Sequence, residues 1–231
     1  MNPGVATPVH IPIDSPEGRV HLAGDLVLSA DNPAIVVFAH GSGSSRLSPR
    51  NQRVARLLQE GGLGTLLFDL LTADEEAVDM RTAHLRFDIR FLAMRLVAAT
   101  DWLRAQPETQ DHRLGYFGAS TGAAAALIAA VERPKAVGAV VSRGGRPDLA
   151  APVLGEVKAP TLLIVGGADR PVIPLNEEAY ARLRCEKRLE IVPGASHLFE
   201  EPGTLDKVAG LALRWFKDHL VVPAPGGQAG F

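Results

Sequence analysis

The stretch YFGASTGAAAA at residues 116–126 places Ser120 between Gly118 and Gly122, in the spacing G-x-S-x-G. An apolar run typical of a strand precedes the serine, and an alanine-rich run typical of a helix follows it. On such a turn the serine hydroxyl is exposed, and glycines let the strand and the helix approach closely. A purely structural turn is the alternative, but the context favours a nucleophilic serine, which needs a base and an acid.

Candidates for the base and the acid follow Ser120 in the chain. Asp169 comes directly after the apolar run TLLIVGG, and His197 comes just after the next run, KRLEIV. In a triad on this kind of turn the chain order is Ser, then Asp or Glu, then His, so we predict His197 as the base and Asp169 as the acid that orients it. Asp148 is the alternative acid. His40 also ends a strand, but it precedes Ser120 and is better suited to shape the loop after it.

An acyl-transfer site also needs N–H groups that stabilise the negative oxygen of the tetrahedral intermediate. The backbone N–H of Thr121, next to the nucleophile, is one candidate. The loop AHGSGSS after an early strand supplies the other, for which we predict the backbone N–H of Ser42. This Gly/Ser loop has no G-K-[ST] sequence, so nucleotide binding is not favoured.

The elements that must position these residues alternate along the chain. DSPEG separates the apolar runs 9–13 and 19–28, which predicts an antiparallel hairpin. Six short apolar runs follow, which predict strands buried on both faces of a sheet (34–40, 64–71, 113–119, 136–142, 161–167 and 187–192). Helical segments between the strands indicate right-handed crossovers, so we predict an α/β fold with a mostly parallel sheet of about eight strands and helices on both faces. Ligands then bind beyond the carboxyl ends of the strands.

Two helices are predicted from their apolar periodicity. Residues 86–104 place Phe87, Phe91, Met94, Ala98 and Trp102 on one stripe, and 205–220 place Val208, Leu211, Trp215 and Phe216 on another. We interpret both stripes as core packing. Residues 72–84 are predicted to be a long loop at the sheet edge, with the acids Asp74, Glu75, Glu76 and Asp79 forming a solvated rim rather than a metal site.

Composition narrows the class of protein. The chain has 231 residues, 46% of them hydrophobic, and a formal net charge of −2. The length suits one domain, which we place at 1–220, with a flexible tail at 221–231. The charge gives no general attraction to nucleic acid or to an anionic membrane. One cysteine, Cys185, excludes an intramolecular disulfide and falls in a predicted helix. Without a leader segment or a membrane-length apolar run, a cytoplasmic protein is expected.

The motifs together resemble those of α/β-hydrolases, and within them the small lidless proteins similar to dienelactone hydrolase. The resemblance runs from AIVVFAHGSGSS through YFGASTGAAAA and VGGADRPVIP to PGASHLFEEPG. It implies an α/β-hydrolase fold without a cap domain and hydrolysis of an ester, lactone or thioester. No ligand spacing in the sequence suggests a metal, and no cofactor is expected. Dienelactone hydrolase itself uses a cysteine, whereas this chain carries Ser120 at that position, and Cys185 matches no nucleophile position.

Arginines follow several of the predicted strands, and a guanidinium aimed at the site would favour an anionic acyl substrate. We predict Arg46 and Arg143 as substrate-binding residues, the alternative being surface ion pairs. The same fold can also serve as a catalytically idle binding or sensor module, and a homodimer is an alternative to a monomer, since a partner subunit could roof an open site. The intact order of Ser120, Asp169 and His197 favours an active hydrolase.

Overall fold

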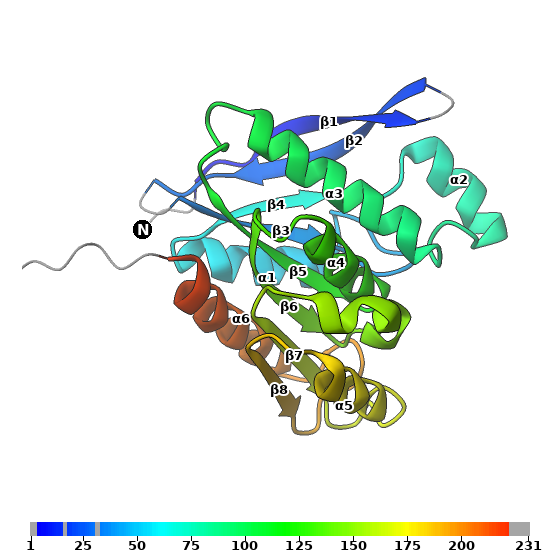
Figure 1. The fold of residues 1–231 in the computed structure, drawn as a ribbon, viewed down its shortest axis with the longest axis vertical. Coiled ribbons are helices and arrows are strands. Elements are labelled where there is room, and N and C mark those ends of the chain that lie inside the picture. Colours follow the sequence, from blue (N-terminus) through cyan, green and yellow to red (C-terminus); the bar gives the residue numbers. More distant parts are fainter. Residues whose placement is uncertain (1–3, 16–17, 31–32, 222–231) are drawn as a thin grey trace, which may run out of the picture.

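The computed structural model describes residues 4–15, 18–30 and 33–221, and one eight-stranded sheet runs through them in the order β1-β2-β4-β3-β5-β6-β7-β8 (Figure 1). The strands of this sheet are β1 (Thr7–Ser15), β2 (Gly18–Val27), β3 (Ala34–Ala39), β4 (Gly64–Phe68), β5 (Arg113–Ala119), β6 (Val137–Arg143), β7 (Thr161–Gly166) and β8 (Lys187–Val192).

The pairing of the strands confirms the predicted hairpin and the parallel sheet. β1 and β2 pair antiparallel from Thr7 opposite Leu26 to Ser15 opposite Gly18, and β2 pairs antiparallel with β4. From β4 through β3 to β8 all neighbouring strands are parallel. The carboxyl ends of the parallel strands therefore meet at one edge, where the loops that carry the candidate residues emerge.

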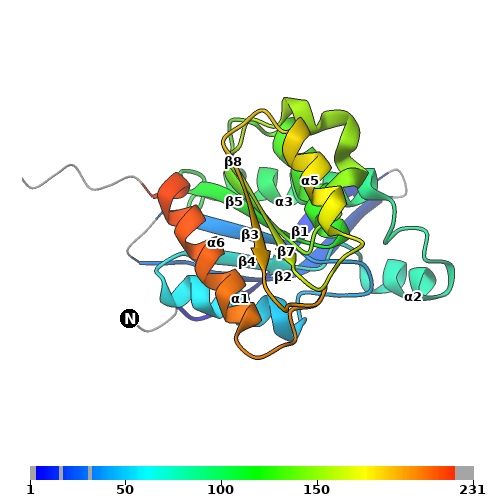
Figure 2. The same ribbon diagram turned by 90° about the horizontal axis from the view of Figure 1, so that it is seen from below.

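Helices cover both faces of the sheet, as Figure 2 shows. On one face lie α1 (Pro49–Glu60) and α6 (Thr204–Leu220), which pack against each other; on the other lie α3 (Ile89–Ala105), α4 (Thr121–Glu132), the 3-10 helix η1 (Pro147–Glu156) and α5 (Ile173–Arg182). A further helix, α2 (Ala73–Thr82), stands at the periphery of the molecule (Figure 1). Each face of the sheet has its own apolar cluster, so the sheet is buried on both sides.

The two predicted helical stripes have different outcomes. In α6, Val208, Leu211, Trp215 and Phe216 are buried, as predicted. Along α3 the stripe prediction is wrong for Phe87, which precedes the helix and is 59% exposed, and for Met94, which is 57% exposed. Its other members, Phe91, Ala98 and Trp102, are partly buried and pack against the core. The buried stripe of α3 is aliphatic instead and includes Leu92, Leu96, Ala99 and Leu103. α3 carries apolar side chains on more than one side, and the side with the aliphatic residues is the one that packs onto the sheet.

The prediction of a loop at 72–84 is wrong, because this segment contains α2. Thr72 and Glu75 form a capping box, in which each side chain accepts a hydrogen bond from the other residue's backbone N–H. The predicted solvated rim is also wrong for Asp79, whose side chain is fully buried against Arg86. Glu75 in turn pairs with the buried Arg95 on α3, so these two ion pairs fix the position of α2.

Between β6 and β7 the described chain contains η1 and short connections, so no cap domain is inserted there. Of the predicted tail, 221–231, all residues beyond Val221 lie outside the described residues. In the ranges that the structure covers, no helix has the length and apolar character needed to cross a membrane.

Candidate active site

Ser120 stands on a strained turn between β5 and α4. Its backbone angles are φ 51° and ψ −120°, a conformation that costs free energy for a residue with a side chain. The glycines on either side permit this turn. A Cβ on Gly122 would lie 2.2 Å from Ala39 O, and one on Gly118 would lie 2.4 Å from Ala123 Cα. Both glycines are therefore required by close backbone approach, as the sequence predicted.

Hydrogen bonds tie the turn to the end of the neighbouring strand. The N–H of Ser120 donates to Arg143 O at 3.3 Å, and Ser120 O accepts from the N–H groups of Ala123 and Arg146, both at 3.1 Å. The backbone of Ser120 is thus held from β6 as well as from α4. This bonding offsets the cost of the strained conformation and fixes the direction of the side chain.

His197 and Asp169 come together after the last two strands. The Nδ1 atom of His197 lies 2.7 Å from Oδ2 of Asp169, whose side chain is only 8% exposed. Because a carboxylate can only accept, Nδ1 carries the hydrogen and Nε2 is left able to accept a proton. The two loops pack tightly, since a Cβ on Gly166 would lie 2.3 Å from Ala195 O.

Ser120 and His197 line one cavity of about 240 Å³, which we call the Ser120 cavity. Its other lining residues are Gly41, Ser42, Ser44, Ser48, Arg50, Asn51, Ala119, Arg143 and Leu198. In the described chain, the hydroxyl of Ser120 makes no hydrogen bond to His197. Such a bond is often long in a free enzyme and shortens when substrate binds.

Asp148, the alternative acid, is engaged elsewhere. Both of its carboxylate oxygens accept hydrogen bonds from Arg146, at 2.9 and 2.7 Å, within the first turn of η1. Asp169 is therefore the carboxylate that contacts His197.

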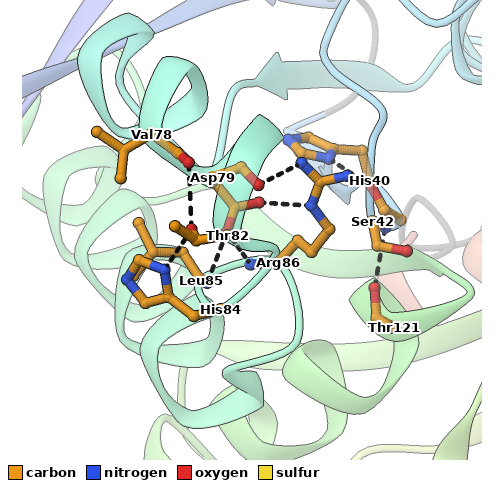
Figure 3. A network of polar contacts seen from close by, with 10 residues as sticks. His40, Ser42, Val78, Asp79, Thr82, His84, Leu85, Arg86 and Thr121 are labelled. Carbon is orange, nitrogen blue, oxygen red and sulfur yellow. Dashed lines mark hydrogen bonds and ion pairs between the residues drawn. The ribbon is translucent and has the colours of Figure 1, made fainter.

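The two predicted oxyanion donors are in different situations. The N–H of Thr121 is at the first position of α4, where N–H groups have no partner within a helix. The N–H of Ser42, by contrast, donates to Oγ1 of Thr121 at 3.0 Å (Figure 3). In this structure it is not free to bind a substrate oxygen, which departs from our expectation for Ser42.

His40 has both ring nitrogens satisfied. Nε2 accepts from the N–H of Leu70 at 3.0 Å, and Nδ1 is 3.0 Å from Gly41 O, which can only accept. The ring is therefore neutral with its hydrogen on Nδ1. Burial lowers the pKa of His40, which favours this neutral form. His40 thus holds the loop after β3 against the loop after β4 and is not available as a base.

Arg143 is buried in the wall of the Ser120 cavity, and no acidic side chain among the described residues pairs with it. It is 5% exposed, one terminal nitrogen donates to Asn51 Oδ1 at 3.3 Å, and its Nε has no hydrogen-bond partner among the described residues. Its guanidinium carbon lies 5.9 Å from the centre of the Phe199 ring. Burial, together with repulsion from Arg50, lowers the pKa of Arg143 to about 10.

Arg46 does not line the Ser120 cavity, and its surroundings match the alternative that we gave for it, an ion pair. Its guanidinium pairs with Asp69 at 2.5 Å and with Asp25 at 3.3 Å, and its backbone N–H also donates to Asp69. Arg46 lines a second cavity of about 550 Å³, the Arg46 cavity, which also includes His10, His21, His40, Ser44, Asp69 and Glu76. Two carboxylates already neutralise this arginine.

Two further features bear on the chemistry. The prediction that Cys185 lies in a helix is wrong, because α5 ends at Arg182. Burial raises the pKa of its half-buried thiol, which disfavours the reactive thiolate. In the ranges described, no group of three or more His, Cys, Asp or Glu side chains is arranged to hold a metal ion.

The sheet order, the strained serine turn and the loops at the carboxyl edge define an α/β-hydrolase fold without a cap domain. Comparison with known proteins is more specific: residues 22–216 match the dienelactone hydrolase family, and the chain belongs to that family. The family and the fold are those of a hydrolase.

Solved structures agree with this assignment. The crystal structure of a dienelactone hydrolase from Anabaena variabilis is 59% identical, with a TM-score of 0.91 over 95% of this chain and all of that one. An α/β serine hydrolase without a lid from Xanthomonas campestris is 25% identical, with a TM-score of 0.70 over 97% of this chain and all of that one.

A longer relative is known from Mycobacterium tuberculosis (strain H37Rv). It is named "Putative phosphoribosyl transferase" and is 57% identical over 210 residues, which are 91% of this chain and 46% of that protein. The chain therefore spans less than half the length of this relative.

Proposed function

We propose that the protein is a serine hydrolase that cleaves an ester, lactone or thioester of a small molecule. The observation that carries the proposal is the placement of Ser120 on a strained turn, in one cavity with His197, whose Nδ1 bonds Asp169 at 2.7 Å. In this proposal Ser120 is the nucleophile, His197 the base and Asp169 the group that fixes the imidazole tautomer.

The reaction has two halves. Ser120 Oγ attacks the carbonyl carbon while its proton moves to Nε2 of His197, and the N–H of Thr121 stabilises the resulting oxyanion. The intermediate collapses, the alcohol or thiol leaves with the proton from His197, and an acyl-enzyme remains. Water, deprotonated by His197, then attacks the acyl carbon and releases the acid and Ser120.

Arg143 supports a finer proposal, that the preferred substrate carries a negative charge. A buried guanidinium without an acidic partner is costly, and a carboxylate of the substrate would supply the missing acceptor. Arg50, which lines the same cavity, adds positive charge there and pairs with the exposed Glu200 at 3.3 Å. We therefore propose Arg143 as a substrate-binding residue and do not retain Arg46.

Turnover of a substrate panel tests the hydrolase proposal. Aryl esters, a lactone and an acyl thioester would be assayed with the wild type, Ser120→Ala, His197→Ala and Asp169→Asn. We expect at least one class to be hydrolysed and the first two variants to lose roughly 10⁴–10⁶ in kcat, because triad members act as a unit. Asp169→Asn should lose about 10⁴, since it leaves the imidazole in the wrong tautomer.

Two results would contradict this proposal. Hydrolysis that survives in Ser120→Ala would exclude Ser120 as the nucleophile. No turnover of any class by a folded wild type would favour the alternative, a binding module that uses the fold without its chemistry.

A further inference from the structure

The contact between Thr121 and Ser42 is not explained by the proposed reaction. Thr121 is 4% exposed and directly follows Ser120, and its hydroxyl oxygen accepts the N–H of Ser42 from a loop 79 residues away in the chain (Figure 3). This bond occupies the donor that the sequence assigned to the oxyanion. We propose that the Thr121 hydroxyl is itself the second oxyanion donor, an inference that rests on the proposed serine hydrolase function.

A count of hydrogens supports this assignment. A hydroxyl has one hydrogen to donate and two lone pairs that accept. In Thr121 one lone pair takes the N–H of Ser42, and no acceptor for the hydroxyl hydrogen is found in the described chain. The N–H of Ser42 has a single hydrogen, which is already used. In the described chain, the hydrogen-bond donor that remains free to bind an oxyanion is therefore the hydroxyl of Thr121 and not the amide of Ser42.

The position of the hydroxyl fits the role. Oγ1 is three bonds from the backbone nitrogen of Thr121, so an oxyanion that binds this N–H is close to the hydroxyl of the same residue. The loop of Ser42 also packs directly on the serine turn, since a Cβ on Gly41 would lie 3.1 Å from Ser120 Cβ and 3.2 Å from Ala119 O. Thr121 and Ser42 are thus held together beside the reacting serine.

The bond from Ser42 also improves the donor. A hydroxyl that accepts a hydrogen bond becomes polarised and donates more strongly, because bonds in a chain reinforce one another. As negative charge develops on the substrate oxygen, Ser42 N–H, the Thr121 hydroxyl and the oxyanion form such a chain. No proton needs to be transferred along it.

Substitution of Thr121 tests the inference. Thr121→Val keeps the shape and removes the hydroxyl, whereas Thr121→Ser keeps the hydroxyl. We expect Thr121→Val to lose roughly 10²–10³ in kcat, the usual cost of one oxyanion donor, with KM changed less than about threefold. Thr121→Ser should retain kcat within about fivefold of the wild type. Thr121→Ala replaces the valine variant if that protein does not fold.

A second measurement separates donation from support of the loop. An aryl trifluoromethyl ketone adds to a catalytic serine and forms an oxyanion, whereas the matched trifluoromethyl alcohol has no carbonyl and forms none. We expect Thr121→Val to weaken binding of the ketone by roughly the same factor as it lowers kcat, since both quantities report oxyanion stabilisation. Inhibition by the matched alcohol should stay within about threefold of the wild-type value, because it has no carbonyl oxygen to become an oxyanion.

The outcomes are distinct from those for the proposed function. If the wild type hydrolyses esters through Ser120 but Thr121→Val keeps or raises kcat, the inference is wrong, and the N–H of Ser42 turns to the substrate directly. An equal loss for the ketone and the matched alcohol would likewise overturn it, in favour of a structural role. If Ser120→Ala remains active, the proposed function itself fails, whatever the Thr121 variants do.

Discussion

Two arginines lie at the same edge of the sheet, Arg143 as the last residue of β6 and Arg46 in the loop after β3, yet their surroundings are opposite. Arg46, in the Arg46 cavity, contacts two carboxylates, Asp69 and Asp25. Arg143, in the Ser120 cavity, is more deeply buried and has a neutral partner, Asn51, and an Nε without a partner in the described chain. Ser44 lines both cavities, so the loop after β3 is their common wall.

The difference shows what each cavity is suited to do. Around Arg46 the charges are balanced within the protein, so an anion that entered would compete with Asp69 and Asp25. Around Arg143 the balance is incomplete, and a substrate anion would complete it at the place where Ser120 reacts. An unpaired buried charge is unfavourable for stability and is thus a better indicator of a binding site than a paired one.

The largest expected difference concerns charge selectivity. Substituting Arg143→Met should lower the preference for an anionic over a matched neutral aryl ester by roughly ten- to a hundredfold, the value of a charge-assisted hydrogen bond of about 1.5–3 kcal/mol. Arg46→Met should leave the preference unchanged. The measurement is kcat/KM for a monoaryl succinate and an aryl butyrate. A wild type that treats both esters alike would refute the role of Arg143.

The selectivity should also depend on pH. Since the pKa of Arg143 is lowered to about 10, the guanidinium is charged below that pH and neutral above it. The ratio of kcat/KM for anionic and neutral esters should therefore be constant from pH 7 to about 9 and fall as the pH passes about 10. In Arg143→Met the ratio should be flat. A wild-type ratio that does not fall by pH 11 would contradict the lowered pKa of Arg143.

The two arginine substitutions should affect stability in the opposite order to substrate selectivity: Arg46→Met should lower the free energy of unfolding more than Arg143→Met. Arg46→Met removes the cation that Asp69 and Asp25 share, and we expect it to lower the free energy of unfolding by about 1–2 kcal/mol. Arg143→Met replaces an uncompensated buried charge by an apolar chain and should be neutral or stabilising. Urea denaturation of both variants checks this. The comparison fails if Arg143→Met is the more destabilising of the two.

His40 holds the loop that separates the two cavities, and it should add a modest pH dependence. The folded protein keeps the ring neutral, whereas the unfolded chain takes up a proton near the ordinary pKa of 6.5. The unfolded state then binds more protons, so the free energy of unfolding should fall as the pH drops below about 6.5. His40→Asn should weaken this dependence, and the exposed control His21→Asn should not. Equal pH dependence in wild type and His40→Asn would contradict the assignment.

The features that sequence predicted best are those with local causes. The serine turn follows from Gly118 and Gly122, whose missing side chains admit neighbouring backbone atoms. The strands are short apolar runs, and their alternation with helices left one reasonable topology. The contact of His197 with Asp169 then followed from chain order, because adjacent parallel strands place their loops side by side.

The features that sequence missed depend on distant partners. Nothing near Arg46 in the chain shows that Asp69 and Asp25 will face it, and nothing near Arg143 shows that no acid will. Thr121 and Ser42 are likewise brought together only by the fold. α2 is an exception, because the capping box formed by Thr72 and Glu75 is a local signal that the sequence contained.

Periodicity also left open which apolar face of α3 is buried. Phe91, Met94 and Trp102 satisfy helical spacing, but so do Leu92, Leu96 and Leu103. Both stripes are apolar, so the spacing alone could not decide which one faces the sheet. The aliphatic stripe is the one that is buried in the structure.

Covalent labelling tests the central claim, that Ser120 is the nucleophile, most directly. The wild type, Ser120→Ala and Ser44→Ala would be treated with a fluorophosphonate, and the adduct located by peptide mass spectrometry. Ser44 is a suitable control because it lines the same cavity. We predict one adduct per chain on Ser120, absent in Ser120→Ala and retained in Ser44→Ala. An adduct on another residue, or full labelling of folded Ser120→Ala, would contradict the account.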